Sequence, residues 1–348
     1  MTRKKIIVFV LVVLIIVTFV AINTLGKGEK NLSVVSVEKP QLQQQQVVTH
    51  PLQIAEMKKR TYPGSEITIE KELASMGSYT QYLSSYISDG LKIYALLTIP
   101  QGEKPPSGWP VIIFNHGYIP PEEYQTTERY LAYVQSFARN GYIVFKPDYR
   151  GHGNSEGNPE GAYFSPAYTV DVLNAVSSVI KLKNANPEKI GMWGHSMGGH
   201  ITLRSMVVSK DIKAGVIWGG VVTSYEDMMN RWRRSVSWRP SGRENMAHRP
   251  SRNDLIEQFG DFESNPGFWE SVSPFYFTSD VSGPIQLHHG LSDESVPWEF
   301  SEALKNRLEQ DGKKVEYYTY EGADHNISSP YFEVAMRRSI TFFDTYLK

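Results

Sequence analysis

The sequence has no cysteine among its 348 residues. This absence excludes disulfide bonds, thiolate nucleophiles and cysteine-ligated metal sites, and it rules out a lipid anchor on an N-terminal cysteine. The sequence also lacks an excess of charge of either sign, because 36 Lys and Arg residues face 37 Asp and Glu residues and leave a net charge of −1. Without a global positive field we expect no nucleic-acid partner.

Motifs for metal binding are missing too. The sequence contains no H-E-x-x-H motif, and the adjacent histidines His288 and His289 lack the spacing of metal ligands. We therefore expect no metal and no other cofactor. Hydrophobic residues make up 41% of the chain and charged residues 21%, which is ordinary globular usage and enough to bury a sizeable core.

A long apolar run stands near the N-terminus, where residues 6–22 follow a basic stretch at residues 3–5. Its length is at the short end of the range for a membrane-spanning helix and exceeds the usual hydrophobic core of a signal peptide. The basic flank predicts a cytoplasmic N-terminus and export of the rest of the chain. Because the cleavage site around Ala21 is poor, we expect residues 1–25 to form a single-pass transmembrane anchor. A cleaved signal segment and a secreted protein are the alternative.

The next stretch, residues 26–64, is polar, contains a glutamine-rich run at residues 41–46 and shows little periodicity. This composition is typical of a flexible linker. The sequence then predicts one folded domain over residues 65–348.

Hydrophobic periodicity changes along this domain. Alternating apolar and polar residues begin near Glu66 and surround the Asp89-Gly90 pair, which predicts antiparallel strands and hairpins. Short apolar runs then alternate with amphipathic segments, which predicts an α/β domain with a mostly parallel central sheet flanked by helices. In such sheets function gathers at the carboxyl ends of the strands. The expected strands cover residues 111–115, 142–148, 190–193, 214–220, 284–290 and 315–322, and the expected helices cover residues 124–139, 167–181, 298–310 and 329–347.

One interval interrupts this alternation. We expect a cap insertion at about residues 221–282, after the sixth strand of the sheet. Its arginines are expected to pair with neighbouring acidic residues on the surface, and contact with an acidic or aromatic substrate group is the alternative. The tryptophans and arginines concerned are Trp232, Trp238, Trp269, Arg231, Arg233, Arg234, Arg239, Arg243, Arg249 and Arg252.

The pentapeptide Gly194-His195-Ser196-Met197-Gly198 has the pattern G-x-S-x-G. A predicted buried strand precedes it and an apolar helical run follows it. In that context the pattern indicates a sharp turn that exposes a nucleophilic serine at the head of a helix. Side chains two residues from Ser196 would collide with neighbouring backbone, which explains the glycines. A purely structural turn is the alternative.

A serine hydroxyl needs a base, and the base needs a carboxylate that orients it. In this kind of fold the chain order is serine, acid, histidine. Asp293 follows one predicted strand after Ser196, and His325 follows the next, so both are expected at the same edge of the sheet. Glu294 is the alternative acid beside Asp293, and Asp324 adjoins His325.

The other histidines have weaker positions. They are His195 inside the pentapeptide, where it is expected to shape the turn, His200 on the following helix, His288 and His289 at a strand end with local hydrogen bonds, and His248 in the insertion. Asp148 and Arg150, in a glycine-rich segment, are expected to brace loops near the turn.

An acyl-transfer site also needs donors for an oxyanion. One expected donor is the backbone N–H of Met197, directly after the serine. The other is expected from the loop at residues 115–118, at the N–H or the hydroxyl of Tyr118. A simple strand-ending turn is the alternative interpretation of this loop.

Five motifs in order, NHGY, DYRGHGNSEG, GHSMGG, HHGLSDESVP and YEGADH, resemble the α/β-hydrolase superfamily. They are most similar to the catalytic domain of prolyl oligopeptidase-type serine peptidases, over residues 65–348. The resemblance implies a Ser196–Asp293–His325 triad, oxyanion donors at Tyr118 and Met197, and cleavage of peptide or amide bonds through an acyl-enzyme.

The resemblance also bears on the substrate. Peptidases of that family resemble a hydrolase domain joined to a large β-propeller, and the region before Glu66 is too short for one. We expect a small-molecule or short-peptide substrate, with a carboxylesterase or lipase-like acyl hydrolase as the alternative function. A non-catalytic, membrane-tethered binding protein on the same fold is a further alternative, although such proteins usually lose a triad member. The sequence makes no prediction of the oligomeric state.

Overall fold

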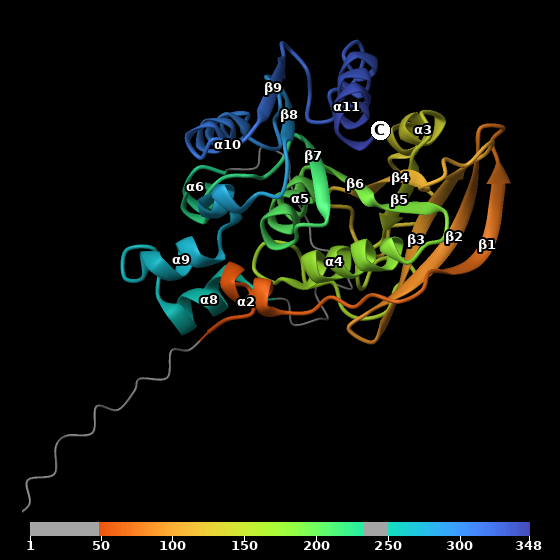
Figure 1. Ribbon diagram of the computed structural model, residues 1–348. Coiled ribbons are helices and arrows are strands. Elements are labelled where there is room, and N and C mark those ends of the chain that lie inside the picture. The colour runs from red at the N-terminus through yellow and green to blue at the C-terminus, as the bar shows by residue number, and fades with distance from the viewer. Residues whose placement is uncertain (1–48, 233–249) are drawn as a thin grey trace, which may run out of the picture. The chain divides into compact units, whose positions relative to one another are not determined.

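The computed structural model describes residues 49–232 and 250–348 (Figure 1). The predicted anchor at residues 1–25 and most of the predicted linker lie outside these ranges. Across the two described ranges, no helix has both the length and the apolar character needed to cross a bilayer.

Nine strands of the described chain form one sheet in the order β1-β2-β3-β5-β4-β6-β7-β8-β9. The pairs from β1 to β5 are antiparallel, and every pair from β5 across to β9 is parallel. Asp89 and Gly90 turn the β2–β3 hairpin with positive φ angles, as an Asp-Gly pair predicts. The strands are β1 (Thr68–Ser75), β2 (Tyr79–Ser88), β3 (Leu91–Pro100), β4 (Trp109–Asn115), β5 (Ile143–Pro147), β6 (Ala185–His195), β7 (Ile212–Trp218), β8 (Ile285–Gly290) and β9 (Val315–Tyr320).

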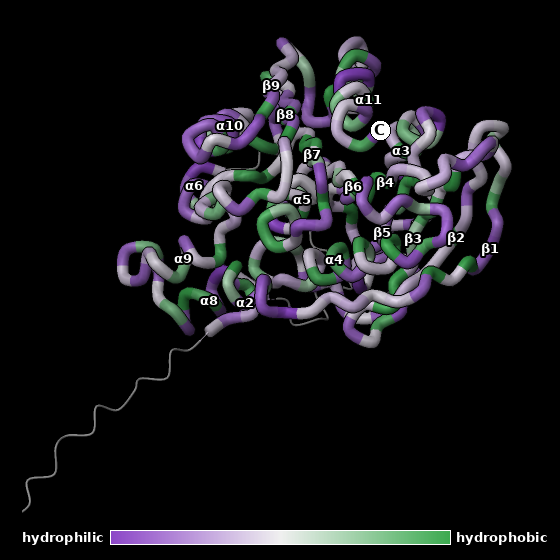
Figure 2. The backbone as a smooth tube through the Cα atoms, viewed as in Figure 1, coloured by the Kyte–Doolittle hydropathy of each residue, from purple (hydrophilic) through white to green (hydrophobic). Residues whose placement is uncertain are grey.

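Helices cover both faces of the sheet (Figure 1). On β4, Val111 and Ile113 pack into one hydrophobic core with α4, α5 and α10. Ile112 and Phe114 point the other way and pack with α3 and α11. Because β4 and β5 are buried on both faces, their residues are mostly hydrophobic (Figure 2). The domain therefore has the predicted α/β-hydrolase architecture. These helices are α3 (Leu131–Arg139), α4 (Ala167–Ile180), α5 (Met197–Val208), α10 (Glu299–Gln310) and α11 (Phe332–Leu347).

Helix α3 begins later than the predicted helix at residues 124–139. Residues before Leu131 form a loop instead, because Tyr124 and Thr126 donate hydrogen bonds to the buried carboxylate of Asp148. This loop carries Tyr130 toward the site. As predicted, Asp148 braces the loop; the buried Lys146 lies in the same network and donates to the Tyr124 hydroxyl at 3.0 Å.

The insertion follows β7, the seventh strand in chain order, rather than the sixth strand as expected. Its described part packs through a third hydrophobic cluster that includes Tyr225, Trp269 and Phe300. Arg231 pairs with Asp227 at 3.3 Å, as expected, whereas the predicted insertion residues 233–249 lie outside the described chain. The elements of the insertion are α6 (Tyr225–Asn230), α8 (Arg252–Phe259), α9 (Pro266–Val272) and the 3₁₀ helix η1 (Pro274–Asp280).

The packed domain begins earlier than residue 65. Residues from Thr49 onward belong to the same compact unit as the sheet, and helix α2 (Ile54–Lys59) buries its apolar side. Leu52 and Ile54 are fully buried. The prediction of a flexible linker is therefore wrong over residues 49–64. A few apolar residues at helical spacing are enough to pack this segment against the rest of the domain.

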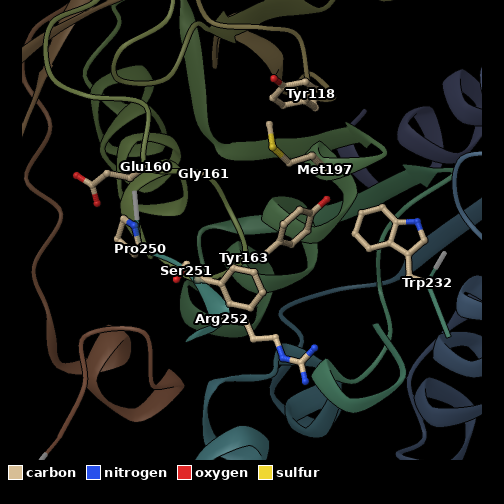
Figure 3. Close-up of a pocket in the computed structure, with 10 residues that line it drawn as sticks. Tyr118, Glu160, Gly161, Tyr163, Met197, Trp232, Pro250, Ser251 and Arg252 are labelled. Carbon is tan, nitrogen blue, oxygen red and sulfur yellow. The ribbon is translucent and has the colours of Figure 1, made fainter. Parts of the chain in front are cut away.

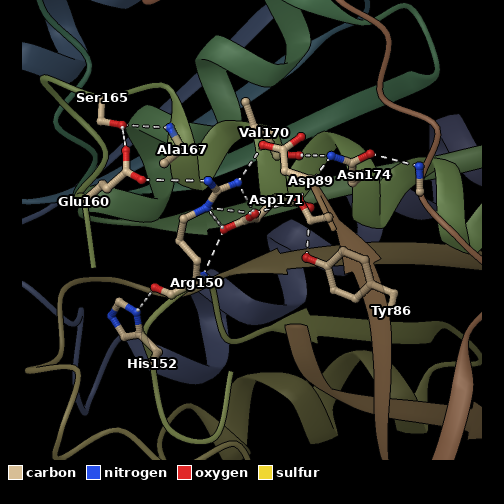
Figure 4. A network of polar contacts seen from close by, with 12 residues as sticks. Tyr86, Asp89, Arg150, His152, Glu160, Ser165, Ala167, Val170, Asp171 and Asn174 are labelled. Carbon is tan, nitrogen blue, oxygen red and sulfur yellow. Dashed lines mark hydrogen bonds and ion pairs between the residues drawn. The ribbon is translucent and has the colours of Figure 1, made fainter. Parts of the chain in front are cut away.

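A buried ion pair joins the antiparallel strands to helix α4 (Figure 4). The guanidinium of Arg150 donates to both carboxylate oxygens of Asp171 on α4, at 2.7 and 3.0 Å for the shortest contacts. It also reaches Asp89 in the β2–β3 turn at 3.0 Å. Burial raises the pKa of Asp171, and the hydrogen bonds from Arg150 oppose that rise. Arg150 thus braces the loops around β5, as the sequence predicted.

Asp171→Asn tests this pair. The change leaves the buried Arg150 cation without its main counter-charge, and we expect the free energy of unfolding to fall by about 3 kcal/mol. Asp89→Asn is the matched control, since its carboxylate is 31% exposed and its loss should cost less than about 1 kcal/mol. Urea unfolding measures both values, and equal losses would contradict a special role for the buried pair.

Candidate active site

Ser196 occupies a sharp turn between strand β6 and helix α5. Its backbone has φ 57° and ψ −118°, a positive φ that is uncommon and strained for a residue other than glycine. The residues on either side of it are buried, but Ser196 itself is partly exposed. The strand, turn and helix therefore lie where the sequence predicted them, with the hydroxyl-bearing residue at the head of α5.

The two glycines of the pentapeptide are required by close backbone approach. A Cβ on Gly194 would lie 2.3 Å from the carbonyl oxygen of Gly198. A Cβ on Gly198 would lie 2.0 Å from the carbonyl oxygen of Asn115, at the end of β4. Both distances are far shorter than any real carbon–oxygen contact, so the turn cannot close over larger residues.

Asp293 and His325 meet at the carboxyl ends of β8 and β9. The Nδ1 of His325 lies 2.7 Å from the Oδ2 of Asp293. The alternative acid Glu294 is exposed, and the carboxylate of Asp324 instead accepts hydrogen bonds from the backbone and hydroxyl of Ser328. Of the acidic residues considered from the sequence, Asp293 is the one that contacts His325.

Four donors surround the carboxylate of Asp293, whose side chain is fully buried. Besides His325, they are the backbone N–H groups of Ser295 and Val296, at 2.8 and 2.9 Å, and the Nε2 of His289 at 3.1 Å. Burial alone would raise the pKa of Asp293, but the hydrogen bonds from His289 and His325 hold it well below its usual value. The group is therefore ionised throughout the neutral range.

The imidazole of His325 lies beside the serine turn. Its ring centroid is 4.5 Å from that of His195, the neighbour of Ser196, and its side chain is 18% exposed. Gly219 leaves room for it, because a Cβ there would lie 3.1 Å from the Nδ1 of His325 and 3.3 Å from the Oδ2 of Asp293. The hydroxyl of Ser196 makes no hydrogen bond within the described chain, and serine–histidine contacts often tighten only when substrate is bound.

A chain of hydrogen bonds runs from the loop after β4 to the His325 loop. The backbone N–H of Gly117 donates to the hydroxyl of Tyr130 at 3.0 Å, and that hydroxyl lies 2.7 Å from the Nδ1 of His195. The Nε2 of His195 lies 3.0 Å from the carbonyl oxygen of His325. Because a carbonyl can only accept, Nε2 carries the proton and the Tyr130 hydroxyl donates to Nδ1.

His195 is neutral in this chain. Burial and the neighbouring His325 lower its pKa to about 3. Each of its ring nitrogens therefore keeps one fixed role in the neutral range, and the loop after β4 stays tied to the loop that carries His325. This agrees with the predicted role of His195 in shaping the turn.

The two predicted oxyanion donors come from the residue directly after Ser196 and from the loop after β4. Met197 is the first residue of α5, and Tyr118 follows Gly117 in the loop after β4. Both residues line a cavity of about 410 Å³ (Figure 3). The ring of His116 supports the loop, because it stacks between Tyr124 and Tyr149 with centroid distances of 4.6 and 4.3 Å.

A sequence model of the prolyl oligopeptidase family matches residues 129–348, which include Ser196, Asp293 and His325. The chain belongs to this family. It is accordingly a serine hydrolase with the function of a peptidase or an esterase.

Two curated relatives from Bacillus subtilis cover most of the chain. The uncharacterized peptidase YtmA is 25% identical over 251 residues, which are 70% of this chain and 85% of that protein. The putative esterase YitV is 24% identical over 251 residues, which are 68% of this chain and 89% of that protein.

Solved structures share the fold. A puromycin-hydrolyzing peptidase from Mycobacterium tuberculosis matches with a TM-score of 0.60 and 20% identity, over 80% of this chain and 41% of that one. An acetyl xylan esterase from Paenibacillus sp. R4 matches with a TM-score of 0.60 and 19% identity, over 84% of this chain and 92% of that one. The chain thus spans less than half of the mycobacterial peptidase and nearly all of the esterase.

For three residues at the site, the sequence alone predicts no role in the site. Tyr130 belongs to no motif and was placed inside a predicted helix. His289 makes local hydrogen bonds, as the sequence predicts, and one of them reaches the carboxylate of Asp293. Its position four residues before that acid is the signal that could have assigned it to the site. Gly219 directly follows β7, where a conformation with φ 52° favours glycine.

Tyr130→Phe tests the hydrogen-bond chain in this prolyl oligopeptidase-family site. Loss of the hydroxyl leaves the Gly117 N–H and the Nδ1 of His195 unpaired, and we expect kcat for an activated ester to fall about tenfold or more with little change in KM. Tyr142→Phe is the matched control, because its hydroxyl bonds Asp344 of α11 at 2.6 Å, away from the site. A kcat that falls equally in both variants would contradict a positioning role for Tyr130.

Proposed function

We propose that the protein cleaves peptide or amide bonds of short peptides through an acyl-enzyme, with Ser196 as nucleophile, His325 as base and Asp293 as the orienting acid. The observation that carries the proposal is the 2.7 Å contact between His325 and Asp293 beside the strained turn of Ser196. Serine, imidazole and carboxylate in this order are the parts that activate a hydroxyl near neutral pH.

The first step forms the acyl-enzyme. The Oγ of Ser196 attacks the carbonyl carbon of the substrate while the Nε2 of His325 takes the hydroxyl proton. The Nδ1–H of His325 stays bonded to the Asp293 carboxylate, which stabilises the imidazolium. Backbone N–H groups of Met197 and Tyr118 donate to the oxyanion, and this electrostatic contribution is usually large.

The second step regenerates the enzyme. The tetrahedral intermediate collapses as His325 gives its proton to the leaving amine or alcohol. Water, activated by the same imidazole, then attacks the acyl carbon, and the acid is released with Ser196 protonated again. Asp293 remains ionised throughout, as its lowered pKa requires.

An esterase is the second candidate. Similarity to the putative esterase YitV, over 89% of that protein's length, supports it. The chemistry at Ser196 is the same for both substrates, because an alcohol replaces the amine as leaving group. The two candidates differ only in which bond the rest of the site accepts.

Labelling with a fluorophosphonate tests the nucleophile. We expect the wild-type protein to be labelled and Ser196→Ala to lose both the label and several orders of magnitude in turnover. Ser292→Ala is the matched control, since Ser292 is an exposed serine next to Asp293, and it should keep the label. His325→Ala should lose as much turnover as Ser196→Ala.

Rates on p-nitrophenyl esters and on short peptide p-nitroanilides then separate the esterase from the peptidase. Retention of the label in Ser196→Ala, or a folded wild-type protein that is never labelled, would overturn the assignment.

We also propose that residues 1–25 anchor the enzyme in a membrane, with the catalytic domain outside the cytoplasm. Support comes from the apolar run at residues 6–22 and its basic flank. Full-length protein should remain in the membrane fraction after a carbonate wash, and protein without residues 1–25 should not. Recovery of both proteins in the soluble fraction would exclude an anchor.

A further inference from the structure

A second histidine shares the carboxylate oxygen that orients His325. The Oδ2 of Asp293 accepts from the Nδ1 of His325 at 2.7 Å and from the Nε2 of His289 at 3.1 Å. The Oδ1 of the same carboxylate accepts instead from the backbone N–H groups of Ser295 and Val296. In the proposed mechanism His325 alone transfers protons, so the fully buried His289 is an imidazole at the acid that the mechanism does not use.

The surroundings of His289 fix which of its nitrogens carries a proton. Its Nε2 lies 3.1 Å from the Oδ2 of Asp293 and 3.1 Å from the carbonyl oxygen of Val296. Both oxygens can only accept, so Nε2 is protonated. Its Nδ1 lies 2.7 Å from the hydroxyl of Ser301 on α10, and a hydroxyl can donate or accept. Nε2 therefore donates to Asp293 whether or not Nδ1 also carries a proton.

Sharing one oxygen weakens the hold of Asp293 on His325. A carboxylate that accepts another hydrogen bond offers less negative charge to its other partners. The imidazolium of His325 depends on that charge, because the carboxylate stabilises the cation. The N–H of His289 therefore makes the imidazolium less stable, and His325 stays an unprotonated base down to a lower pH.

The other ionisable groups around this pair have weaker influence. His195 is neutral, because burial and the neighbouring His325 lower its pKa to about 3. The carboxylate of Asp324 bonds to the backbone and hydroxyl of Ser328. Acidic residues of the loop after β8 and of the first turn of α10 are exposed, where water and salt screen their charge; they are Glu294, Glu299 and Glu302. Over the described ranges, His289 is the ionisable side chain besides His325 that contacts the Asp293 carboxylate.

We propose that His289 is a positioning residue that sets the pH at which His325 begins to act as a base. The inference rests on the proposed acyl-enzyme function and adds a residue that tunes the base of that site. His289 acts through Asp293 and does not line the cavity beside Tyr118 and Met197. Its effect is to extend catalysis to a lower pH than the Asp293–His325 pair alone would allow.

The pH dependence of kcat/KM for p-nitrophenyl acetate tests the proposal on the full-length enzyme, because this profile reports the base of the free enzyme. His289→Leu removes the donor and keeps the buried site apolar. We expect the acid limb of the profile to move upward by about one pH unit, which is the effect of losing part of one hydrogen bond to a charged group. An acid limb that does not move in the folded variant would overturn the proposal.

His289→Gln is the conservative rescue. Its amide nitrogen can take the place of Nε2 and donate to Asp293, but it carries no charge. We expect the acid limb of the wild type in this variant. A displacement as large as that of His289→Leu would show that the donated hydrogen bond is not responsible, and the proposal would fail.

Ser301→Ala gives a further test that leaves the imidazole in place, which matters if His289→Leu does not fold. Loss of the hydroxyl at Nδ1 weakens the Nε2–H donor through the ring. We expect the acid limb to move in the same direction as in His289→Leu, by a smaller amount. Here, too, an unmoved limb counts against the proposal.

His288→Leu is the matched control. His288 is the neighbour of His289 on β8 and is equally buried, but its ring bonds the hydroxyl of Tyr320 at 2.8 Å and the amide oxygen of Gln286 at 2.7 Å. Burial lowers its pKa well below the usual value, so it is neutral. We expect this variant to lose stability in thermal unfolding and to keep the wild-type acid limb. Equal displacement in both leucine variants would contradict a specific role for His289.

The outcomes separate this proposal from the proposed function. If the wild-type enzyme is labelled at Ser196 by a fluorophosphonate but its acid limb is indifferent to His289, the inference fails alone. If the folded wild type is not labelled and Ser196→Ala hydrolyses the acetate at the wild-type rate, the acyl-enzyme function fails, and the inference fails with it. Thermal unfolding verifies that each variant is folded.

Discussion

The buried carboxylate of Asp293 is the constraint on which the rest of the site depends. Removing a charged group from water is costly unless donors replace the lost hydration. Here two backbone N–H groups and two imidazoles supply them. To gather these donors, strands β8 and β9 must end side by side and the loop after β8 must turn back on the carboxylate. The parallel register of the two strands makes this possible.

A second set of hydrogen bonds fixes the other loops of the site at the same edge of the sheet. The strained turn of Ser196, the loop after β4 and the His325 loop are joined through Tyr130 and His195. His195 keeps one fixed hydrogen-bond role at each ring nitrogen, because burial and the neighbouring His325 lower its pKa to about 3. The scaffold leaves Ser196, whose hydroxyl has no bonding partner in the described chain, as the group that is open to react.

The sequence predicted the parts of the site that depend on local patterns. The strand before Ser196, the glycines around it, and the acid and histidine after two successive strands all have short signatures. Tyr130 could not be found this way, because its contact with His195 depends on a loop that long-range hydrogen bonds to Asp148 hold open. The docking of Leu52 and Ile54 was missed for the same reason: a short apolar segment gains stability only from a surface formed by residues far away in sequence.

The hydrogen bond between Trp232 and Ser295 has a thermodynamic consequence. Ser295 donates its N–H to the Asp293 carboxylate and accepts from the Trp232 indole with its carbonyl oxygen. One residue therefore connects Trp232, which lines the cavity beside Tyr118 and Met197, to the acid of the site. If a ligand restrains Trp232 and thereby the loop that holds Asp293, reciprocal linkage requires an ordered Asp293 loop to strengthen the binding of that ligand by the same free energy.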